Sequence, residues 1–480
     1  MKRLAAALGL GLCWLGSGCD ERYAQTAELS NTGGATSTPG YGGAPACAGT
    51  LQLSQVRITL PEDIRYKAAA YDTLMRDERV ALAIGPDQKP NVAWLNNSGN
   101  TVHITALNND GTLRGPDAVL PSSEVGGLVA LADGFMVLTS GPDPGDEQLD
   151  PNDGNVALDR AALLTRFEGT TLSFTRALTG SQQLGSATSA WRHDCTPTTL
   201  RGRLAFNGVR YGAYFDDHGC VGHPRASQYG DKLVYMDPQG NVSAGGFTWF
   251  CSINMGTQLL AEATGPFSTF GMCDGSPGQG LNQLFEGRSS LLSPEYATQG
   301  YVGAQFGGAV KMADGSYVLA WSSRGPAEPS PQDAPDIAFM RLKRDFSVAT
   351  PRLWLTQTPA IAENNVHVAP WGPDKVVVIW DSVEITMPLR RMGETFLGTY
   401  VGTRARLFDL NGVPLGDEQP LDVPPNSEDD IAVYANRDLG WAIVPDAQRS
   451  YSAQWAADGR GVPLIDNLNK LSIARLVYCQ

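Results

Sequence analysis

The chain has 480 residues, of which 42% are apolar and 18% charged, with 54 Gly and 31 Pro. It is long and apolar enough for a large core, which excludes disorder throughout, and its many Gly and Pro residues argue against a helix-rich fold. The net charge of −14 repels polyanions, and Lys and Arg form no cluster beyond the first three residues. Nucleic acid is therefore not expected as a partner.

Residues 1–18 have the order of a secretory signal peptide. Basic Lys2 and Arg3 are followed by the apolar stretch Leu4–Leu15, which is too short to span a bilayer, and then by small residues. Cys19 comes next, and this order resembles the lipid-attachment site of bacterial lipoproteins, although Gly16 stands where Leu is usual. The resemblance implies cleavage before Cys19 and lipidation of its thiol. The alternative is an ordinary signal peptide, with Cys19 incidental.

Residues 19–46 are rich in Gly, Ser, Thr, Ala and Pro and contain little that could be buried. Such a composition is typical of a flexible tether. A tether after a lipidated Cys19 would hold a folded domain, residues 47–480, away from the headgroups. We therefore expect an exported bacterial lipoprotein of the cell envelope, in the outer membrane or facing the periplasm, with the lipid anchor as its only membrane contact.

The folded region begins with the strand-like segment Leu51–Leu60. Before Val80, apolar residues then recur at helical spacing, which predicts either one short helix or an irregular crossing segment. These residues are Ile64, Ala68, Tyr71 and Met75.

From Val80 onward, apolar alternating runs recur in a fixed order: a strand ending in Trp, a second strand, a tight turn with Gly, and a third strand. The order is visible in Gln88–Leu120, Leu131–Leu178, Met312–Leu355 and Gly372–Val423. Trp94, Trp321 and Trp380 end equivalent strands, and we interpret them as core residues rather than sugar-stacking platforms. The turn sequences NDGT, PQGN and LNGV fit hairpins that need a positive φ.

Four antiparallel strands in each copy of about 45 to 60 residues are typical of propeller blades. We predict an all-β protein, a β-propeller of seven four-stranded blades, with six or eight as alternatives. The predicted blades start near Val80, Val125, Leu200, Met255, Ala309, His367 and Ile431. The final strand-like segment, Leu471–Cys479, should pair with Leu51–Leu60, so that the chain ends share a blade and leave no sheet edge open.

The repeats also resemble a bacterial family of propeller repeats, in which a DG-apolar-W segment precedes D-I-x-x-R-x-F/L-D-x-x-G-x-P-L. The resemblance is clearest in Asp314–Trp321, Asp336–Leu342 and Arg406–Leu415. It implies the propeller fold and a secreted or lipoprotein context. No catalytic residues belong to the motif, so it implies no chemistry.

Six of the eight Cys residues fall in the folded region, an even number that predicts three disulfides in an exported chain. Similar local separations favour Cys195–Cys220 and Cys251–Cys273 among the fifteen connectivities. The remaining pair is Cys47 and Cys479, at the two ends, where a bond would lock the ring closure. Free thiols are the alternative.

Two clusters suggest ligands. His193, His218 and His223 flank the predicted Cys195–Cys220 bond, with Asp194, Asp216 and Asp217 beside them, which would suit a metal or acid–base site, although their spacing fits no familiar zinc motif. The segment Asp143–Asn155 offers Asp143, Asp146, Asp150 and Asp153 as calcium ligands without the order of an EF-hand loop. The alternative for both is a set of solvated loop residues. No other cofactor is indicated.

The sequence contains no nucleophile elbow, no phosphate-binding loop and no sialidase box. We therefore expect a monomeric, non-catalytic binding or scaffold module whose partner is an envelope protein or glycan, contacted through long loops after Ser140, Ser323 and Ser382. The alternative is an envelope polysaccharide hydrolase or lyase that uses carboxylates in the propeller funnel. An enzyme should show inward carboxyls or a His close together there, whereas a binding module should show no perturbed acid.

Overall fold

In the computed structural model of the protein, the described residues all belong to one compact unit, residues 46–480. The structure describes residues 51–65, 79–142, 160–178, 196–218, 229–247, 251, 254–263, 265–273, 278–285, 288–298, 301–302, 304–327, 334–388, 396–426, 430–444 and 468–478. These residues form strands and turns, with no helix among them. Accordingly, the described part of the chain offers no helix long and apolar enough to cross a membrane.

Each of the first three blades is one antiparallel sheet of four consecutive strands. Blade 1 contains β2 (Ala81–Ile84), β3 (Pro90–Leu95), β4 (Thr101–Ala106) and β5 (Ala118–Pro121). Blade 2 contains β6 (Glu124–Leu131), β7 (Gly134–Pro142), β8 (Arg160–Glu168) and β9 (Thr171–Ala177). Blade 3 contains β10 (Thr196–Phe206), β11 (Tyr211–His218), β12 (Tyr229–Met236) and β13 (Val242–Phe247).

Blades 4 to 6 repeat the pattern. Blade 4 contains β14 (Asn254–Leu260), β15 (Ser268–Cys273), β16 (Gly280–Phe285) and β17 (Arg288–Pro294), and a small hairpin of β18 (Ala297–Thr298) and β19 (Tyr301–Val302) follows it. Blade 5 contains β20 (Ala304–Lys311), β21 (Tyr317–Ser323), β22 (Asp336–Leu342) and β23 (Val348–Trp354). Blade 6 contains β24 (Ile361–Pro370), β25 (Lys375–Pro388), β26 (Phe396–Asp409) and β27 (Gln419–Leu421).

Blade 7 joins the two ends of the folded region. It contains β28 (Ala432–Val433), β29 (Leu439–Ile443), β30 (Leu468–Val477) and, as its outermost strand, β1 (Gln52–Ile64). β1 pairs antiparallel with β30, from Gln52 opposite Val477 to Thr59 opposite Lys470. The predicted closure by the terminal strands is therefore confirmed.

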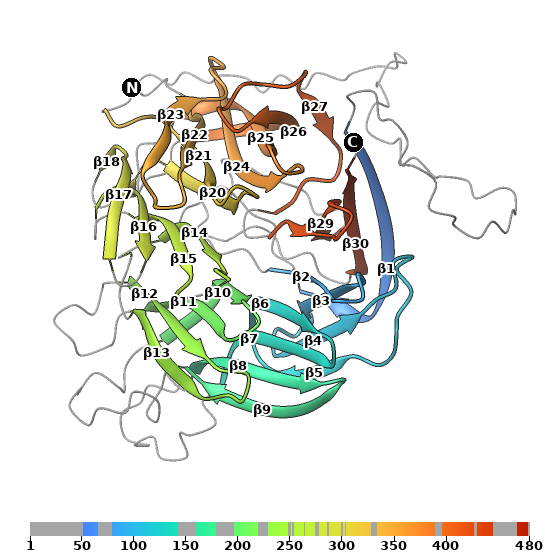
Figure 1. Cartoon of the computed structure of the whole chain (residues 1–480). Helices are drawn as coiled ribbons and strands as arrows, with labels where there is room; N and C mark the ends of the chain where they lie inside the picture. The colour runs from blue at the N-terminus through green and yellow to red at the C-terminus, as the bar shows by residue number, and fades with distance from the viewer. Residues whose placement is uncertain are drawn as a thin grey trace, which may run out of the picture. The chain divides into compact units, whose positions relative to one another are not determined.

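The seven blades follow one another around a ring in chain order (Figure 1), and the predicted seven-bladed β-propeller is confirmed. Every blade starts within six residues of its predicted start. Of the two alternatives for the segment before Val80, the helix is wrong at Ile64, which is fully buried and ends β1 by pairing with Leu468. The other residues of that prediction, Ala68, Tyr71 and Met75, lie outside the described residues.

The core consists of the blades themselves and the seams between them. Trp94, Trp321 and Trp380 are at most 1% exposed in equivalent second strands, as predicted, and Trp441 of β29 is a fourth member. The indole Nε1 of Trp321 donates to the Glu295 carboxylate, so burial leaves this polar atom satisfied. Each such ring contributes about 2–3 kcal/mol of burial free energy.

The innermost strands of blades 2 to 6 carry a register shift, which lies next to a glycine in blades 2 to 5 and at Asn365 in blade 6. Close approach explains two of the glycines: a Cβ on Gly127 would lie 2.8 Å from the Leu204 Cβ, and one on Gly307 would lie 2.5 Å from the Val366 Cβ. The bulges bring neighbouring innermost strands together around the axis. The candidate site includes three of these bulge positions, Gly126, Gly202 and Asn365.

One expected loop is instead a pair of strands. β25 runs on past Ser382 to Pro388 and pairs with β26 from Phe396, so the insertion predicted after Ser382 is largely an extended hairpin. Ala362, Val383 and Tyr400 form a small cluster at its base, which supports the continued pairing. The predicted hairpin glycines do adopt positive φ, at Gly111, Gly240 and Gly412.

Candidate functional site

The chemically interesting side chains gather on one side of the propeller. Because consecutive strands are antiparallel, the start of each first strand, the end of each second strand and the start of each third strand lie on the same face. The connections after Ser140, Ser323 and Ser382 all join second to third strands, so they belong to this face, as predicted. We call it the insertion face.

An ion-pair cluster at the axis connects four blades. Arg79, just before β2, donates from Nη1 to the carbonyl oxygens of Gly126 in β6 (2.8 Å) and Gly202 in β10 (2.6 Å). Its Nη2 donates to Asp430, just before β28. Arg203 of β10 brings its Nε to 3.4 Å from the other Asp430 oxygen. Blades 1, 2, 3 and 7 are thus joined through one buried guanidinium.

Asp430 is surrounded by protein, although 34% of its side chain is accessible. Burial acts to raise the pKa of its carboxyl, but the Arg79 and Arg203 guanidiniums and His367 outweigh this effect. The pKa of Asp430 is therefore lowered, and the group is ionised at neutral pH. The Asp430 carboxylate is therefore a fixed negative charge and has no proton to donate at neutral pH.

A polar network in blade 6 approaches the same cluster. Asn365 adopts φ 48° at the bulge of β24, where several other innermost strands have Gly. Its amide donates to Asp381 Oδ2 (3.1 Å) and to the Pro425 carbonyl (3.0 Å), and its Oδ1 lies 3.3 Å from His367 Nε2. Thr403 in turn donates to Asp381 Oδ1 (2.5 Å). Asn adopts a positive φ more readily than most residues. The bulge can therefore hold a side-chain amide at this position, where it bonds to Asp381 and to the Pro425 carbonyl.

Two carboxyls meet in the seam between blades 5 and 6. Glu363 of β24, 3% exposed, interacts with Asp336 at the start of β22. Burial, and then the neighbouring Asp336 carboxyl, raise the pKa of Glu363 to about 8. Burial likewise raises the pKa of Asp336, which Thr356 and the Thr358 N–H partly stabilise as the anion. The pair therefore shares a proton at neutral pH.

A third buried carboxylate, Glu295, anchors the connection that follows blade 4. It accepts hydrogen bonds from Trp321 (2.9 Å) and Ser323, and pairs with Arg352 at 3.0 Å. Burial raises the pKa of Glu295 despite these partners. Because its side chain is only 1% exposed, its role is to join blades 4 and 5.

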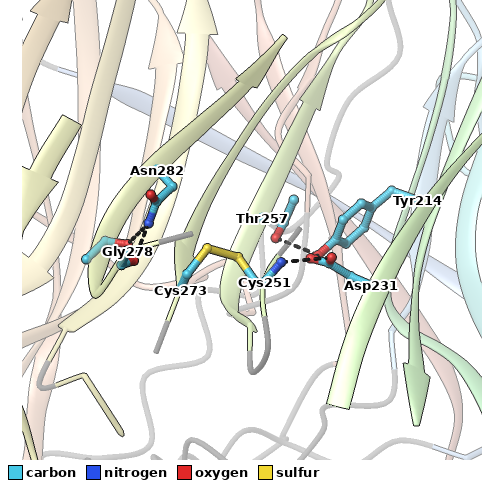
Figure 2. The surroundings of a disulfide bond; sticks show 8 residues. Tyr214, Asp231, Cys251, Thr257, Cys273, Gly278 and Asn282 are labelled. Carbon is cyan, nitrogen blue, oxygen red and sulfur yellow. Dashed lines mark hydrogen bonds between the residues drawn. A yellow bond between two sulfur atoms is a disulfide. The ribbon is translucent and has the colours of Figure 1, made fainter. Parts of the chain in front are cut away.

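Figure 2 shows the disulfide between Cys251 and Cys273, which confirms that predicted pair. It ties the chain entering β14 to the end of β15 on the insertion face. The Asp231 carboxylate accepts hydrogen bonds from the Cys251 N–H (2.9 Å) and from the hydroxyl of Tyr214 (2.5 Å), to which Thr257 donates in turn. This buried group orients the covalent link.

The predicted histidine cluster is only partly visible. Asp216 is buried at the end of β11 and faces Asp231 of β12 across the strand pair, while the backbones of Asp217 and His218 continue the same pairing. The rest of the cluster lies outside the described residues, namely His193, Asp194 and His223. No group of three metal-ligating side chains occurs among the residues that are described.

Several other predicted positions also lie outside the described residues. They are Cys19, Cys47, Cys195, Cys220, Cys479 and the calcium candidates Asp143, Asp146, Asp150 and Asp153. Lipidation, the two remaining disulfides and the calcium loop stay predictions.

Sequence reasoning missed Arg79, Asp430 and Glu363. Arg79 and Asp430 are remote in the chain, and neither belongs to a motif, so their pairing follows only from ring closure. One signal was available: Glu363, Asn364 and Asn365 form a run of three consecutive polar residues near the start of an innermost strand.

No protein family model and no curated protein matches the chain. Solved structures do match. The Dos1 propeller has 10% identity and a TM-score of 0.43, with 86% of this chain and 81% of that chain covered. An α-L-arabinanase of Penicillium chrysogenum complexed with arabinobiose has 10% identity and a TM-score of 0.40, covering 89% and 99%. A protein of unknown function from Dyadobacter fermentans has 12% identity and a TM-score of 0.38, covering 74% and 98%. Similarity at these values transfers no function to this chain.

Proposed function

We propose that the protein is a non-catalytic binding module of the bacterial cell envelope, exported and anchored by a lipid on Cys19. The state of its acids carries this proposal. Asp430 is ionised and paired with two guanidiniums, whereas Glu363 and Glu295, whose pKa values are raised, are at most 5% exposed in blade seams. The pKa of half-buried Asp336 is also raised, but this carboxyl shares its proton with Glu363. A polymer substrate would therefore meet no accessible proton donor at Asp430, Glu363 or Glu295.

The hairpin of blade 6 is the recognition element we assign to the partner, an envelope protein or glycan. β25 and β26 pair as far as Pro388 and Phe396, beyond the length of the blade, and the cluster at the base of the hairpin includes Ala334 of the neighbouring second-to-third strand connection. A paired hairpin loses less conformational entropy on binding than a loop of equal length. It therefore supports recognition on the insertion face.

The experiment compares capture by the intact chain with capture by a shortened hairpin. Glu384 pairs with Thr399, so replacing residues 385–398 by Asn-Gly closes a two-residue turn in register. Val413→Ser, a change at an exposed residue in a third-to-fourth strand turn on the opposite face, is the matched control. Envelope extracts and a glycan array are probed with each variant, with and without calcium.

We expect the shortened hairpin to lose capture while Val413→Ser retains it. Calcium-dependent capture would implicate the loop Asp143–Asn155. Equal capture by both variants would show that the hairpin is not the recognition element. Lipidation is tested separately: palmitate labelling should require Cys19 and disappear in Cys19→Ser.

A hydrolase or lyase is the second candidate, favoured by one observation. Glu363 holds a proton at neutral pH beside Asp336, as a general acid requires. If glycan turnover is found and Glu363→Gln abolishes it while Asp417→Asn, an exposed surface change, does not, the non-catalytic proposal is wrong.

A further inference from the structure

A pocket of about 330 Å³ opens in the seam between blades 3 and 4, away from the hairpin of blade 6. Its walls are mainly aromatic and aliphatic: Leu233, Tyr235, Phe247, Phe267 and Leu284. The volume lies at the lower end of the range for small-molecule sites, which suits a ligand with an apolar body and few polar atoms.

The pocket exists because β13 lacks a bulky residue where the other outermost strands have one. In the six other seams the outermost strand places an apolar side chain against the next blade: Ile58, Leu120, Phe174, Leu292, Leu353 and Leu421. β13 has Gly245 and Gly246 at its bulge and contributes only Phe247, at its last position.

Backbone geometry keeps these two positions as glycine. Gly245 and Gly246 have φ of 103° and 81°, in the region that L side chains avoid. A Cβ on Gly246 would also lie 2.1 Å from the Leu233 carbonyl oxygen. The missing bulk is therefore a built feature of the seam.

The pocket contains a buried polar group without a partner. Thr269 of β15 lines it, is fully buried, and its Oγ1 makes no hydrogen bond with any of the described residues. A buried hydroxyl in this state is destabilising unless a ligand supplies a partner.

A cation stands beside the pocket as well. The guanidinium of Arg210 lies 4.6 Å from the centroid of the Tyr235 ring, and no carboxylate among the described residues pairs with it. The ring itself is held, because the Tyr235 hydroxyl accepts the Phe267 N–H at 2.9 Å. A fixed positive charge next to apolar walls favours an anionic ligand with an apolar body.

We propose that this pocket binds small organic acids of the arylalkanoate type. The carboxylate pairs with Arg210, the aryl group packs among Leu233, Phe267 and Leu284, and a polar substituent on the ring hydrogen-bonds Thr269. This site is independent of the proposed role of the blade 6 hairpin.

The test measures binding to the full chain by calorimetry with three probes. These are 3-(4-hydroxyphenyl)propionate, its neutral amide, and 3-phenylpropionate, which lacks the hydroxyl. We expect saturable one-to-one binding of the hydroxylated acid, at least about tenfold weaker binding of the amide, and weaker binding of the phenyl analogue.

Variants assign each contact. Arg210→Met should weaken binding of the hydroxylated acid at least about tenfold and leave binding of the amide unchanged. Arg210→Lys should give an affinity for the acid between those of the wild type and Arg210→Met. The matched control is Arg176→Met, since Arg176 stacks on Phe174 in the neighbouring seam and should not matter. Thr269→Val should weaken only the hydroxylated probes, without lowering the thermal midpoint, because it removes an unpartnered hydroxyl.

The proposal is overturned by the absence of saturable binding up to about 5 mM. It is equally overturned if the amide binds as well as the acid, or if Arg210→Met and Arg176→Met weaken binding to the same extent.

Discussion

Asp430 illustrates how the ring sets the charge of a single residue. Taken alone, a carboxylate deep in a protein should hold its proton, but two guanidiniums from other blades reverse that tendency. Glu363 has the opposite environment, with a second carboxyl as neighbour and no cation paired with it among the described residues. Two acids on the same face thus carry different charges at neutral pH.

Asp430→Asn should destabilise the fold by about 3 kcal/mol, because it leaves Arg79 buried without its counter-ion. The free energy of unfolding from urea titration at pH 7 measures this. Asp417→Asn, at an exposed turn, should stay within about 0.5 kcal/mol of the wild type. A loss at Asp430 no larger than at Asp417 would contradict the structural role of the cluster.

The same variant tests how the stability of the fold depends on acidic pH. The folded pKa of Asp430 is lowered, so its stabilisation is present above the unfolded value near 4 and is lost as pH falls through the folded pKa. Denaturation midpoints measured between pH 7 and pH 3 should therefore fall more steeply for the wild type than for Asp430→Asn. Parallel curves would show that the carboxylate is not stabilised in the folded state.

For Glu363 we expect the opposite dependence of folding stability on pH, and Glu363→Gln tests it. With a folded pKa of about 8, Glu363 keeps a proton that the unfolded chain releases above about 4.5, so wild-type stability falls between those values. The slope is about 1.4 kcal/mol per pH unit for one proton. Glutamine cannot titrate, and urea titrations from pH 5 to 9 should show that slope removed in the variant. The prediction fails if both proteins lose stability in parallel.

Among the strands, bulges and the disulfide determine which side chains and pockets each blade contributes to the candidate sites. The register shift in β24 directs Asn365 to the axial network, and the bulge in β13 opens the pocket beside Arg210. The Cys251–Cys273 disulfide ties the connection between blades 3 and 4 to β15, on the insertion face. Departures from the repeat therefore coincide with the candidate sites.

Replacing Cys251 and Cys273 together by Ala should lower the free energy of unfolding by about 3 kcal/mol, because the bond closes a short loop in the unfolded chain. Guanidinium titration without reductant measures the loss. Non-reducing peptide mapping of the wild type should recover this cross-link, and it also tests the predicted Cys195–Cys220 and Cys47–Cys479 bonds. An unchanged midpoint would mean that the disulfide adds no stability.

For the whole molecule, closure depends on one strand from the N-terminal end. β1 covers β30 and buries Ile58, Leu60 and Ile64 in the seam with blade 1. Without β1, the seam between blades 7 and 1 would expose the apolar surface that these side chains cover.

Deleting residues 51–65 should therefore yield protein that aggregates, because the apolar seam between blades 7 and 1 loses Ile58, Leu60 and Ile64 and is exposed. Analytical size exclusion measures the monomer fraction, and a synthetic peptide of residues 51–65 should restore part of it. A soluble, monomeric deletion variant would show that the ring closes without β1.

The sequence alone determined the fold class, the seven blades and the closing pair of strands, because alternating apolar residues, turn glycines and recurring Trp are local signals repeated along the chain. It also indicated the Cys251–Cys273 bond, whose partners are near in sequence. Only the tertiary structure decided that Arg79 meets Asp430, that Glu363 meets Asp336 and that Gly246 leaves a pocket open. Those contacts join residues from different blades or from the two ends of the chain. The spacing of residues along the sequence does not indicate which side chains of a neighbouring blade they will meet.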